Sequence, residues 1–226
     1  ISDNVIYNGL CYKRRPTTLT YDILRQMART PQIASIIQTR IDQAMKYSEF
    51  TTDVQKPGWT IVKNVSRFAD DKERELDDRD KRNINNLVDW LERGGNDVNE
   101  WEGDDWDGFL KKTYRDSWEI DQGCVEISWL KRGIPHQYQN VDGRTIRLAE
   151  TFDDEHYQNQ NAQENKEKEL LGYLPRYVQV YRSQVRHEFY PWEMCMGMRN
   201  QVSNVFNNGY ATSELEILVQ IVTWML

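Results

Sequence analysis

Residues 207–226 read NNGYATSELEILVQIVTWML, a short polar turn followed by an almost continuously apolar run. Ser213, followed three residues later by Glu216, is a capping box: the hydroxyl accepts from a first-turn amide, and the carboxylate reaches back to the amide of Ser213. A helix is therefore predicted to begin near Ser213. Apolar residues cover most of its circumference, so we expect protein to enclose it. These apolar residues are Leu215, Ile217, Leu218, Val219, Ile221, Val222, Trp224 and Met225.

The apolar run ends without the usual signals that close a helix. It contains no closing glycine, no basic last turn and no proline. The chain also begins with Ile1 rather than with methionine. We therefore expect these 226 residues to be a fragment of a longer encoded protein, and the intact mass of that gene product tests the expectation.

The composition is polar for a chain that folds. With 226 residues, of which 38% are hydrophobic, the chain can bury a sizeable core in one large domain or two small ones. The charged fraction of 29% suggests solvated segments or surfaces that other subunits complete. A chain of net charge -7 lacks the extensive basic surface of proteins that read nucleic-acid sequences, but it can still carry a local basic patch. The candidates for such a patch are Arg176, Arg182, Arg186 and Arg199.

Cysteines and local motifs bound the class of protein further. Cys11, Cys124 and Cys195 stand far apart and form no CxxC pair, so we expect reduced cysteines of a cytosolic protein. The first residues lack the pattern of a signal peptide, and no run approaches the roughly 20 apolar residues that cross a bilayer. GxSxG, Walker A and GxGxxG motifs are missing as well. The sequence predicts no membrane contact and no nucleotide site.

Helical periodicity predicts four further helices. Thr30 would cap one of them, and Pro31 would occupy its first turn, where a missing amide costs nothing. The glycines at 94–95 suit the C-cap of another. The four helices are expected over residues 21–29, 30–45, 84–94 and 104–113. The buried face of the second would hold Ile33, Ile36, Ile37, Ile41, Ala44 and Met45.

Short alternating runs predict small antiparallel sheets. Residues 125–129 alternate in polarity, and Asp142 with Gly143 is expected to form a hairpin turn before 145–148. Residues 153–169 are almost wholly polar, which is typical of a mobile or inserted segment. Further strands are expected over 59–62, 177–181 and 185–189. The predicted fold class is α+β, with amphipathic helices, small antiparallel sheets and a C-terminal helix.

Acidic clusters and histidines favour surface roles over metal binding. Asp104, Asp105 and Asp107 precede Gly108 as in a calcium loop, but the glycine has the wrong offset and the closing glutamate is absent. Helix capping explains these acids better. Residues 70–79 mix both charges, the pattern of a solvated face. The histidines share no ligand spacing; they are His136, His156 and His187.

An enzymatic alternative rests on carboxylates and tryptophans. Glu119, Asp121 and Glu126 could supply the pair of acids of a glycosidase, although any acidic chain offers such pairs. Tryptophans could form a platform that stacks on sugars, but core or subunit packing explains them more simply. A carbohydrate-active enzyme is thus the alternative, and an α+β scaffold of a host cell is a third hypothesis. The eight tryptophans are Trp59, Trp90, Trp101, Trp106, Trp118, Trp129, Trp192 and Trp224.

The order of several motifs resembles that of tailed-bacteriophage portal proteins. An early amphipathic helix is followed by the Pro57-Gly58-Trp59 turn, by DQGCVE at 121–126 and by VDGRTI at 141–146. The sequence GYATSELE at 209–216 looks like the GYGxSELE segment of this family, with Ala211 where a second glycine is common. The resemblance covers most of the chain and implies the N-terminal part of a portal subunit.

This resemblance implies a structural protein without catalytic residues, metal or cofactor. Residues 1–211 would form a wing-like α+β domain that includes the polar segment 153–169. Residues 212–226 would begin an inner or stem-type helix, and a clip, a second stem helix and a crown would follow. Portal subunits form a homo-oligomeric ring at one capsid vertex, a dodecamer by resemblance. A separate terminase drives DNA in through this ring, and DNA also leaves through it.

The resemblance also implies partners, a location and site residues. Partners would be other copies of the chain, the major capsid protein, terminase, the head-tail adaptor and double-stranded DNA, which the acidic chain would contact weakly and without sequence preference. The location would be the portal vertex of the virion, and the host cytoplasm during assembly. The family-motif residues are Asp121, Gln122, Glu126, Asp142, Gly209, Tyr210, Ser213, Glu214 and Glu216. Leu218, Val222 and Trp224 are candidates for packing between subunits.

Overall fold

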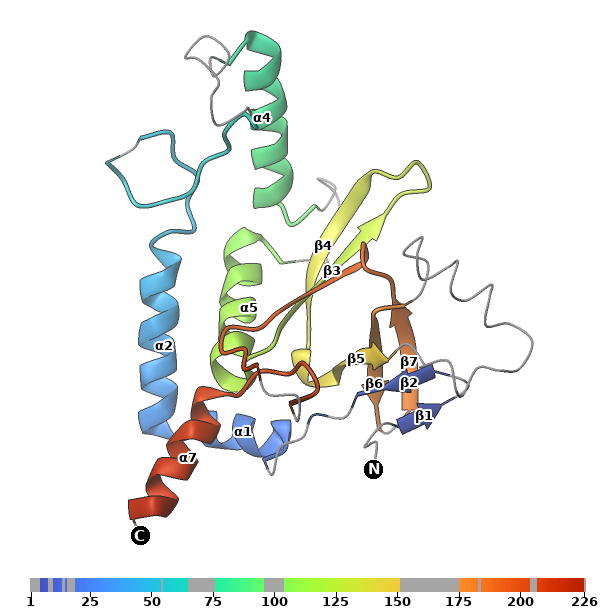
Figure 1. Cartoon of the computed structure of the whole chain (residues 1–226). Coiled ribbons are helices and arrows are strands. Elements are labelled where there is room, and N and C mark those ends of the chain that lie inside the picture. Colours follow the sequence, from blue (N-terminus) through green and yellow to red (C-terminus); the bar gives the residue numbers. More distant parts are fainter. Residues whose placement is uncertain are drawn as a thin grey trace, which may run out of the picture.

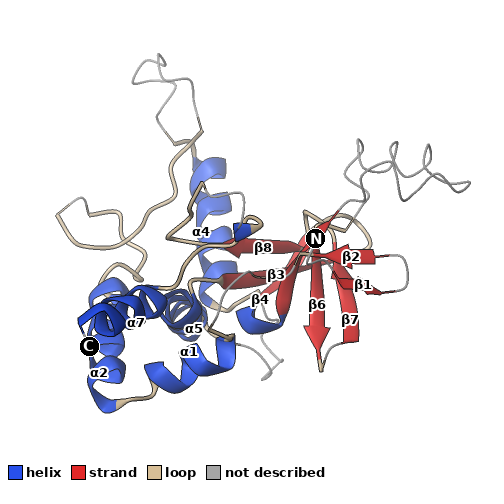
Figure 2. Ribbon diagram, turned by 60° about the horizontal axis from the view of Figure 1, so that its bottom comes forward, coloured by secondary structure: helices blue, strands red, loops and turns tan. Residues whose placement is uncertain are grey.

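The computed structural model describes residues 5–7, 10–13, 15, 19–53, 55–64, 76–95, 104–150, 175–182, 184–203 and 207–225. Its helices are α1 (Tyr21–Ala28), α2 (Pro31–Met45), α4 (Asp78–Glu92), α5 (Trp106–Ile120) and α7 (Glu214–Met225). Helices α1, α2, α5 and α7 gather on one side of the molecule and the strands on the other, while α4 projects away from both (Figures 1 and 2). The predicted α+β class is confirmed.

Side chains of N-cap residues fix the start of three helices. Thr20 accepts from the amide of Ile23, Asp77 from that of Asp80 and Asp105 from that of Gly108. Each bond satisfies an amide that lacks a partner inside its helix. The acidic cluster before α5 therefore caps a helix, as expected, and Asp104 pairs with Lys112 at 2.6 Å.

The described part of the chain contains eight strands, which form two antiparallel sheets. One sheet has the order β4-β3-β8 and the other the order β1-β2-β5-β6-β7. The first contains β3 (Gly123–Trp129), β4 (Pro135–Val141) and β8 (Met194–Gly197). The second contains β1 (Val5–Tyr7), β2 (Leu10–Tyr12), β5 (Ile146–Glu150), β6 (Tyr177–Tyr181) and β7 (Gln184–Phe189). The predicted hairpin of 177–181 and 185–189 is present, because β6 and β7 pair antiparallel.

Two apolar clusters hold these layers together. Helix α5 packs against α1, α2 and α7 on one side and contacts β3 and β4 on the other. The helical cluster consists of Tyr21, Leu24, Ala28, Ile37, Ile41, Ile120 and Leu215. The second cluster lies between the sheets and consists of Cys124, Ile146, Phe189 and Met194. Because Ile120 and Cys124 follow each other closely, the α5–β3 connection links both clusters.

Helix α4 is attached to the body mainly through its last turns. The Trp90 ring meets the Tyr138 ring edge-on at 5.4 Å, and the Tyr138 hydroxyl donates to the carbonyl of Leu91. The row of aromatic rings continues from Tyr138 through Phe109 and Trp106 to Trp59. Most of α4 is otherwise exposed, which fits its projection from the body in Figure 1.

Two predictions about strands and turns are wrong. The strand predicted over 59–62 is absent: Trp59 makes an isolated bridge with Phe50, and Val62 is 75% exposed. The Trp59 indole donates instead to the carbonyl of Ser48 at 2.7 Å, so packing of this ring sets the local backbone. Asp142 and Gly143 form no hairpin turn, because a 3-10 turn at Gly143–Thr145 carries the chain from one sheet into the other.

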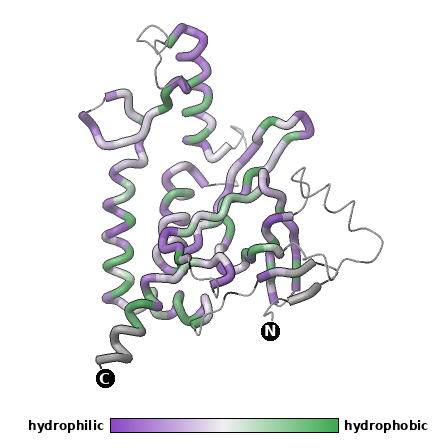
Figure 3. The backbone as a smooth tube through the Cα atoms, viewed as in Figure 1, coloured by the Kyte–Doolittle hydropathy of each residue, from purple (hydrophilic) through white to green (hydrophobic). Residues whose placement is uncertain are grey.

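The predictions about helix contacts hold in part. Thr30 is the N-cap of α2 and Pro31 opens the helix, as predicted, but the Thr30 hydroxyl makes no cap bond and donates instead to the carbonyl of Met27. Ile36 of the expected buried face is 60% exposed. At the start of α7, Leu215 is buried, whereas Ile217 and Leu218 are 43% and 47% exposed, so the single chain does not enclose these two side chains. The first turns of α7 are nevertheless hydrophobic in Figure 3, so a single chain leaves apolar surface on this helix.

Several predictions concern residues that the structure does not describe. They include the polar segment 153–169, residues 70–75 of the charged run, His156 and Trp101. The side chains of Val222 and Trp224 belong here too. Among the helices described, none is both long enough and apolar enough to cross a membrane.

Candidate functional site

Five of the motif residues are buried at the junction of α5, β3 and α7. They are Asp121, Gln122, Tyr210, Ser213 and Glu216, all no more than 7% exposed. The junction forms because α5 ends at Asp121 in a left-handed conformation, with φ of 55°, which turns the chain directly into β3. Aspartate tolerates this conformation better than most residues other than glycine. The motif residues therefore mark the place where the helical side meets the sheets.

Gln122 uses both ends of its amide inside this junction. Its oxygen accepts from the Tyr21 hydroxyl at 2.5 Å. Its nitrogen donates to the carbonyls of Gly143 and Ile146 at 2.8 and 3.0 Å. One fully buried side chain thus connects α1 with the turn that joins the two sheets. A buried amide satisfied in this way specifies one arrangement, because any displacement leaves polar groups without partners.

Asp121 holds the segment that follows β8. Its carboxylate accepts from the backbone amides of Arg199 and Asn200 at 3.0 and 2.9 Å. Burial raises the pKa of this carboxyl, and the two amide hydrogen bonds oppose the increase. The carboxylate therefore acts as a fixed acceptor, and the structure gives it a positioning role.

Tyr210 connects the segment before α7 to the N-terminal part of the chain. Its hydroxyl donates to the carbonyl of Lys13 at 2.8 Å and accepts from the amide of Leu148 at 2.9 Å. Burial raises the pKa of this phenol well above its usual range. Gly209 precedes it with φ of +84°, where an added Cβ would lie 3.2 Å from Leu148 Cδ1. Glycine is needed at this turn for both reasons.

Ser213 and Glu216 fix the direction in which α7 leaves the junction. The Ser213 hydroxyl accepts from the amide of Leu215 at 3.2 Å, the predicted cap, and donates to the carbonyl of Glu119 at 3.1 Å. The Glu216 carboxylate forms an ion pair of 2.7 Å with Arg15, and both side chains are almost fully buried. The start of α7 is therefore attached both to the end of α5 and to the segment before α1.

Two guanidinium groups flank the Tyr21 ring in the same junction. Arg15 lies 4.8 Å and Arg147 5.1 Å from the ring centroid, within the range of cation–π attraction. Burial raises the pKa of Tyr21 to about 12, although both cations act to lower it. The phenol thus remains a hydrogen-bond donor toward Gln122 at any physiological pH.

A second polar cluster lies beside the junction, around Arg25. Its guanidinium contacts Asp116 and Asp142 at 2.8 Å each and Glu119 at 3.8 Å. The other oxygen of Asp116 accepts from the amide of Gly143 at 3.3 Å. Burial raises the pKa of Asp116 to about 6, because desolvation outweighs the attraction of Arg25. This cluster ties α1, α5 and the turn after β4 together.

The remaining motif residues lie at the border of the junction. Asp142 caps its own turn by accepting from the amide of Arg144 at 3.2 Å. Glu214 pairs with Arg199 at 3.2 Å, and the Arg199 guanidinium lies 3.6 Å from the Trp118 ring centroid. Glu126 is separate: it lies along β3 and accepts from Gln139 at 2.8 Å.

The residues proposed for a glycosidase do not form a pair of available acids. Glu119 faces Arg25 and Arg115, Asp121 binds backbone amides and Glu126 binds Gln139. The Trp59 and Trp106 indoles pack against protein and donate to the same Ser48 carbonyl, whereas Trp129 and Trp192 are each 42% exposed. Within the described ranges no three His, Cys, Asp or Glu side chains converge as metal ligands.

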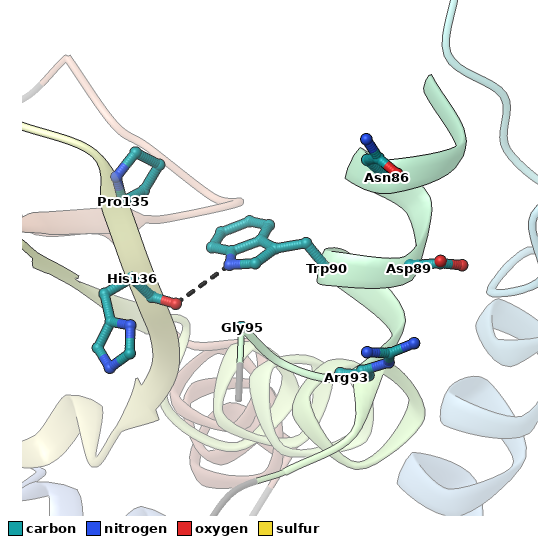
Figure 4. Close-up of a pocket in the computed structure, with 7 residues that line it drawn as sticks. All are labelled: Asn86, Asp89, Trp90, Arg93, Gly95, Pro135 and His136. Carbon is teal, nitrogen blue, oxygen red and sulfur yellow. Dashed lines mark hydrogen bonds between the residues drawn. The ribbon is translucent and has the colours of Figure 1, made fainter. Parts of the chain in front are cut away.

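Surface pockets add no reactive constellation. A pocket of about 380 Å³ lies between α4 and β4, where the Trp90 indole donates to the His136 carbonyl at 3.1 Å (Figure 4). Asp89 and Arg93 point away from this indole in the same view. A groove of about 520 Å³ lies between α2, α5 and β8, with Trp118 and Val125 among its mainly apolar residues.

The motifs indicate several residues of the junction but not the partners of these residues. Arg15, Tyr21, Arg25 and Asp116 belong to no motif, and each meets its partners through long-range contacts. For Arg25 and Asp116 the sequence offers one signal, a charged residue within a helix that packs in the core, because charged residues are rarely buried without a partner.

No family model matches this chain. It is 25% identical over 202 residues to a probable portal protein of Staphylococcus phage Twort, covering 88% of this chain. The chain spans 32% of the length of that relative. A solved structure, the neck of an empty GTA particle computed with C6 symmetry, covers 64% of this chain and 32% of its own at 12% identity, with a TM-score of 0.43.

The similarity to the Twort protein includes most of the chain, so it must include most of the residues quoted above for the resemblance. The resemblance to tailed-phage portal proteins is therefore confirmed, and this chain is portal-like in sequence along nearly its whole length.

Proposed function

We propose that this chain belongs to the subunit of a phage portal, a structural ring at one vertex of the capsid through which DNA enters and leaves. The observation that carries the proposal is the similarity to a probable portal protein over 88% of the chain. The subunit is not an enzyme in this proposal: the three carboxylates suggested for a glycosidase are each bound by protein groups. No observation favours the carbohydrate-active alternative.

The geometry of the junction supports a mechanical role. In this proposal the subunit keeps its outer domain and its inner helix at a fixed angle while DNA moves past. In this chain buried hydrogen bonds of Gln122, Asp121 and Ser213 join helices to sheets, and the Arg15–Glu216 pair fixes the first turn of α7. Satisfied buried polar groups favour one rigid arrangement. In this proposal residues 1–211 are the wing-like domain, and residues 212–226 begin the inner helix.

Exposed apolar surface on α7 supports assembly into a ring. Ile217 and Leu218 are 43% and 47% exposed, although α7 is the most apolar of the helices that the structure describes. A second copy of the chain would remove this surface from water. Leu218 is therefore proposed as a contact between subunits, together with Val222 and Trp224 farther along α7.

The remaining partners follow from the proposed role. The ring would meet the major capsid protein, terminase and the head-tail adaptor, in the virion and earlier in the host cytoplasm. Duplex DNA would pass with weak contacts, because many Lys and Arg contacts to phosphate would have to break at every step. A net charge of -7 agrees with such a channel.

Electron microscopy of the purified full-length protein tests the proposal. We expect cyclic rings with a central channel, with residues 214–225 on the channel side. A protein that stays monomeric at all concentrations in light scattering would contradict the ring. Turnover of a glycan by the purified protein would contradict the structural role.

A further inference from the structure

The tip of the β3–β4 hairpin carries a cluster of exposed apolar side chains. Trp129, Leu130 and Ile134 are 42%, 46% and 54% exposed, and Trp192 beside them is 42% exposed. The Trp129 indole donates to the carbonyl of Trp192 at 2.9 Å, so the neighbouring loop supports the tip. Large apolar groups gathered on one exposed feature are typical of a surface that binds another protein.

The tip is held in one conformation. The amide of Leu130 donates to the carbonyl of Ile134, and that of Gly133 to the carbonyl of Leu130, both at 2.9 Å. Gly133 has φ of +71° and no atom within 4 Å of an added Cβ, so the turn stands free of the body. A pre-ordered tip loses little conformational entropy when it binds.

The charge at this tip is positive. Lys131 and Arg132 occupy the turn, both exposed, and residues 128–137 contain no acid. Within the part of the chain that the structure describes, neither cation forms an ion pair. In a chain of net charge -7, an apolar surface with two adjacent cations selects a partner that is acidic and partly apolar.

The same chain carries a surface of that chemistry elsewhere. A pocket of about 380 Å³ lies where the end of α2, the start of α5 and the end of α4 meet. Its carboxylates come from all three regions, and Phe50 and Trp106 supply aromatic surface. The acids are Glu49, Glu92, Asp105 and Asp107.

The positions of Asp105 and Asp107 are explained by the helix that they begin, whereas those of Glu49 and Glu92 are not. Asp105 caps α5 and Asp107 lies in its first turn, where a negative charge is favourable. Glu92 is instead the last residue of α4, where the helix dipole disfavours an anion, and Glu49 adds a further like charge. Among the described residues that line the pocket, none is basic. A cation from outside would relieve this repulsion.

The tip cannot reach the acidic pocket of its own chain. Tyr138 lies five positions after Gly133, a distance of about 17 Å along an extended strand, and the Tyr138 ring packs on Trp106 at the border of the pocket. Figure 1 shows the hairpin pointing away from the start of α5 and from the end of α2. Each copy therefore presents a basic apolar tip on one side and an acidic pocket on the other.

We propose that the β3–β4 tip of one copy docks in the acidic pocket of a second copy, with Lys131 and Arg132 facing Glu49 and Glu92. The pocket has room for a long side chain, while Leu130 and Ile134 would cover its aromatic rim. Because the two surfaces differ, the same contact can repeat from copy to copy. The copies close into a ring when the rotation between neighbouring copies is a whole fraction of a full turn. The inference rests on the proposed portal function and identifies one contact between its subunits.

Charge reversal in the full-length protein tests this contact. Lys131→Glu with Arg132→Glu forms the tip variant, and Glu49→Lys with Glu92→Lys forms the pocket variant. Each should raise the concentration for half-assembly about tenfold or more, because like charges then face each other. The chain that carries all four substitutions should assemble nearly as the wild type does, an outcome that misfolding would not produce. The matched control is Arg79→Glu with Arg186→Glu, an equal change of charge at exposed positions.

Light scattering and electron microscopy over a protein concentration series separate the outcomes. Tip and pocket variants that form rings as the wild type does would overturn the contact and leave the portal function intact. A wild type that does not associate would contradict both. Open filaments that respond to charge reversal would support the contact and contradict the ring. A tip variant that assembles normally but loses binding to labelled duplex DNA would show that nucleic acid occupies the tip instead.

Discussion

Replacing Asp116 with asparagine tests whether the attraction of Arg25 or the loss of hydration on burial has the larger effect on the Asp116 carboxylate. Asp116 is 6% exposed and contacts the Arg25 guanidinium at 2.8 Å and the amide of Gly143 at 3.3 Å. An ion pair at this distance suggests that the charge stabilises the fold. Burial nevertheless raises the pKa of Asp116 from 3.8 to about 6, so loss of hydration outweighs the attraction. Ionised Asp116 should therefore lower the stability of the folded chain.

The direction of the pH effect follows from proton binding. Between pH 4 and 6 the folded chain keeps a proton on Asp116 that the unfolded chain has lost. The contribution of Asp116 is thus fully present at low pH and disappears as the pH rises through about 6. A pKa difference of this size corresponds to roughly 3 kcal/mol in the free energy of unfolding. Arg25 keeps Asp142 at 2.8 Å and Glu119 at 3.8 Å after the substitution, so its charge is not left alone.

Urea denaturation followed by tryptophan fluorescence measures the effect between pH 4 and 8. We expect Asp116→Asn to match the wild type near pH 4 and to be more stable by up to about 3 kcal/mol at pH 7.5. Asp89→Asn is the control, because Asp89 is exposed on α4 and should change the stability little at every pH. A variant that is less stable than the wild type at pH 7.5 would show that the ion pair dominates, and would refute the reasoning.

Three further predictions address the junction, the ring and DNA. Gln122→Leu should lower the free energy of unfolding by about 2–4 kcal/mol, because it removes partners from the Gly143 and Ile146 carbonyls and from Tyr21; exposed Gln139→Leu is the control in the same urea titration. Leu218→Asp should weaken ring formation by the full-length protein about tenfold or more in light scattering, because it places a charge in the proposed contact between subunits. The melting temperature of the variant should equal that of the wild type, because Leu218 is 47% exposed in the single chain. Val62→Asp is the control at another exposed position, and an equal loss of ring formation in this variant would show that Leu218 is not a specific contact. Binding of labelled duplex DNA, measured by fluorescence anisotropy over a salt series, should be weak and independent of sequence; tight and strongly salt-dependent binding would indicate a protein that grips DNA.

The sequence by itself determined most helices and the position of the motif residues. The start of α5 was readable because an N-cap depends on a few neighbouring residues: Asp105 caps the helix through the amide of Gly108, three residues away. Its end was not readable, because the helix continues to Ile120, seven residues beyond the predicted residue 113. The cap of α7 at Ser213 was readable for the same reason. The portal resemblance was likewise contained in short segments, since DQGCVE and GYATSELE keep their order in any conformation of the chain.

Only the tertiary structure decided what those residues do. The turn at Asp142 looks like a hairpin locally, but the chain changes sheets there because Gln122 and Asp116 bind the backbone of Gly143. Trp59 lies in no strand because its indole meets Ser48, a contact that strand propensity does not include. Likewise, no pattern shows that Arg25 gathers three carboxylates from α5 and the turn at Asp142. Local bonds repeat at fixed spacing and can be read from residue types, whereas partners distant in sequence depend on how the whole chain packs.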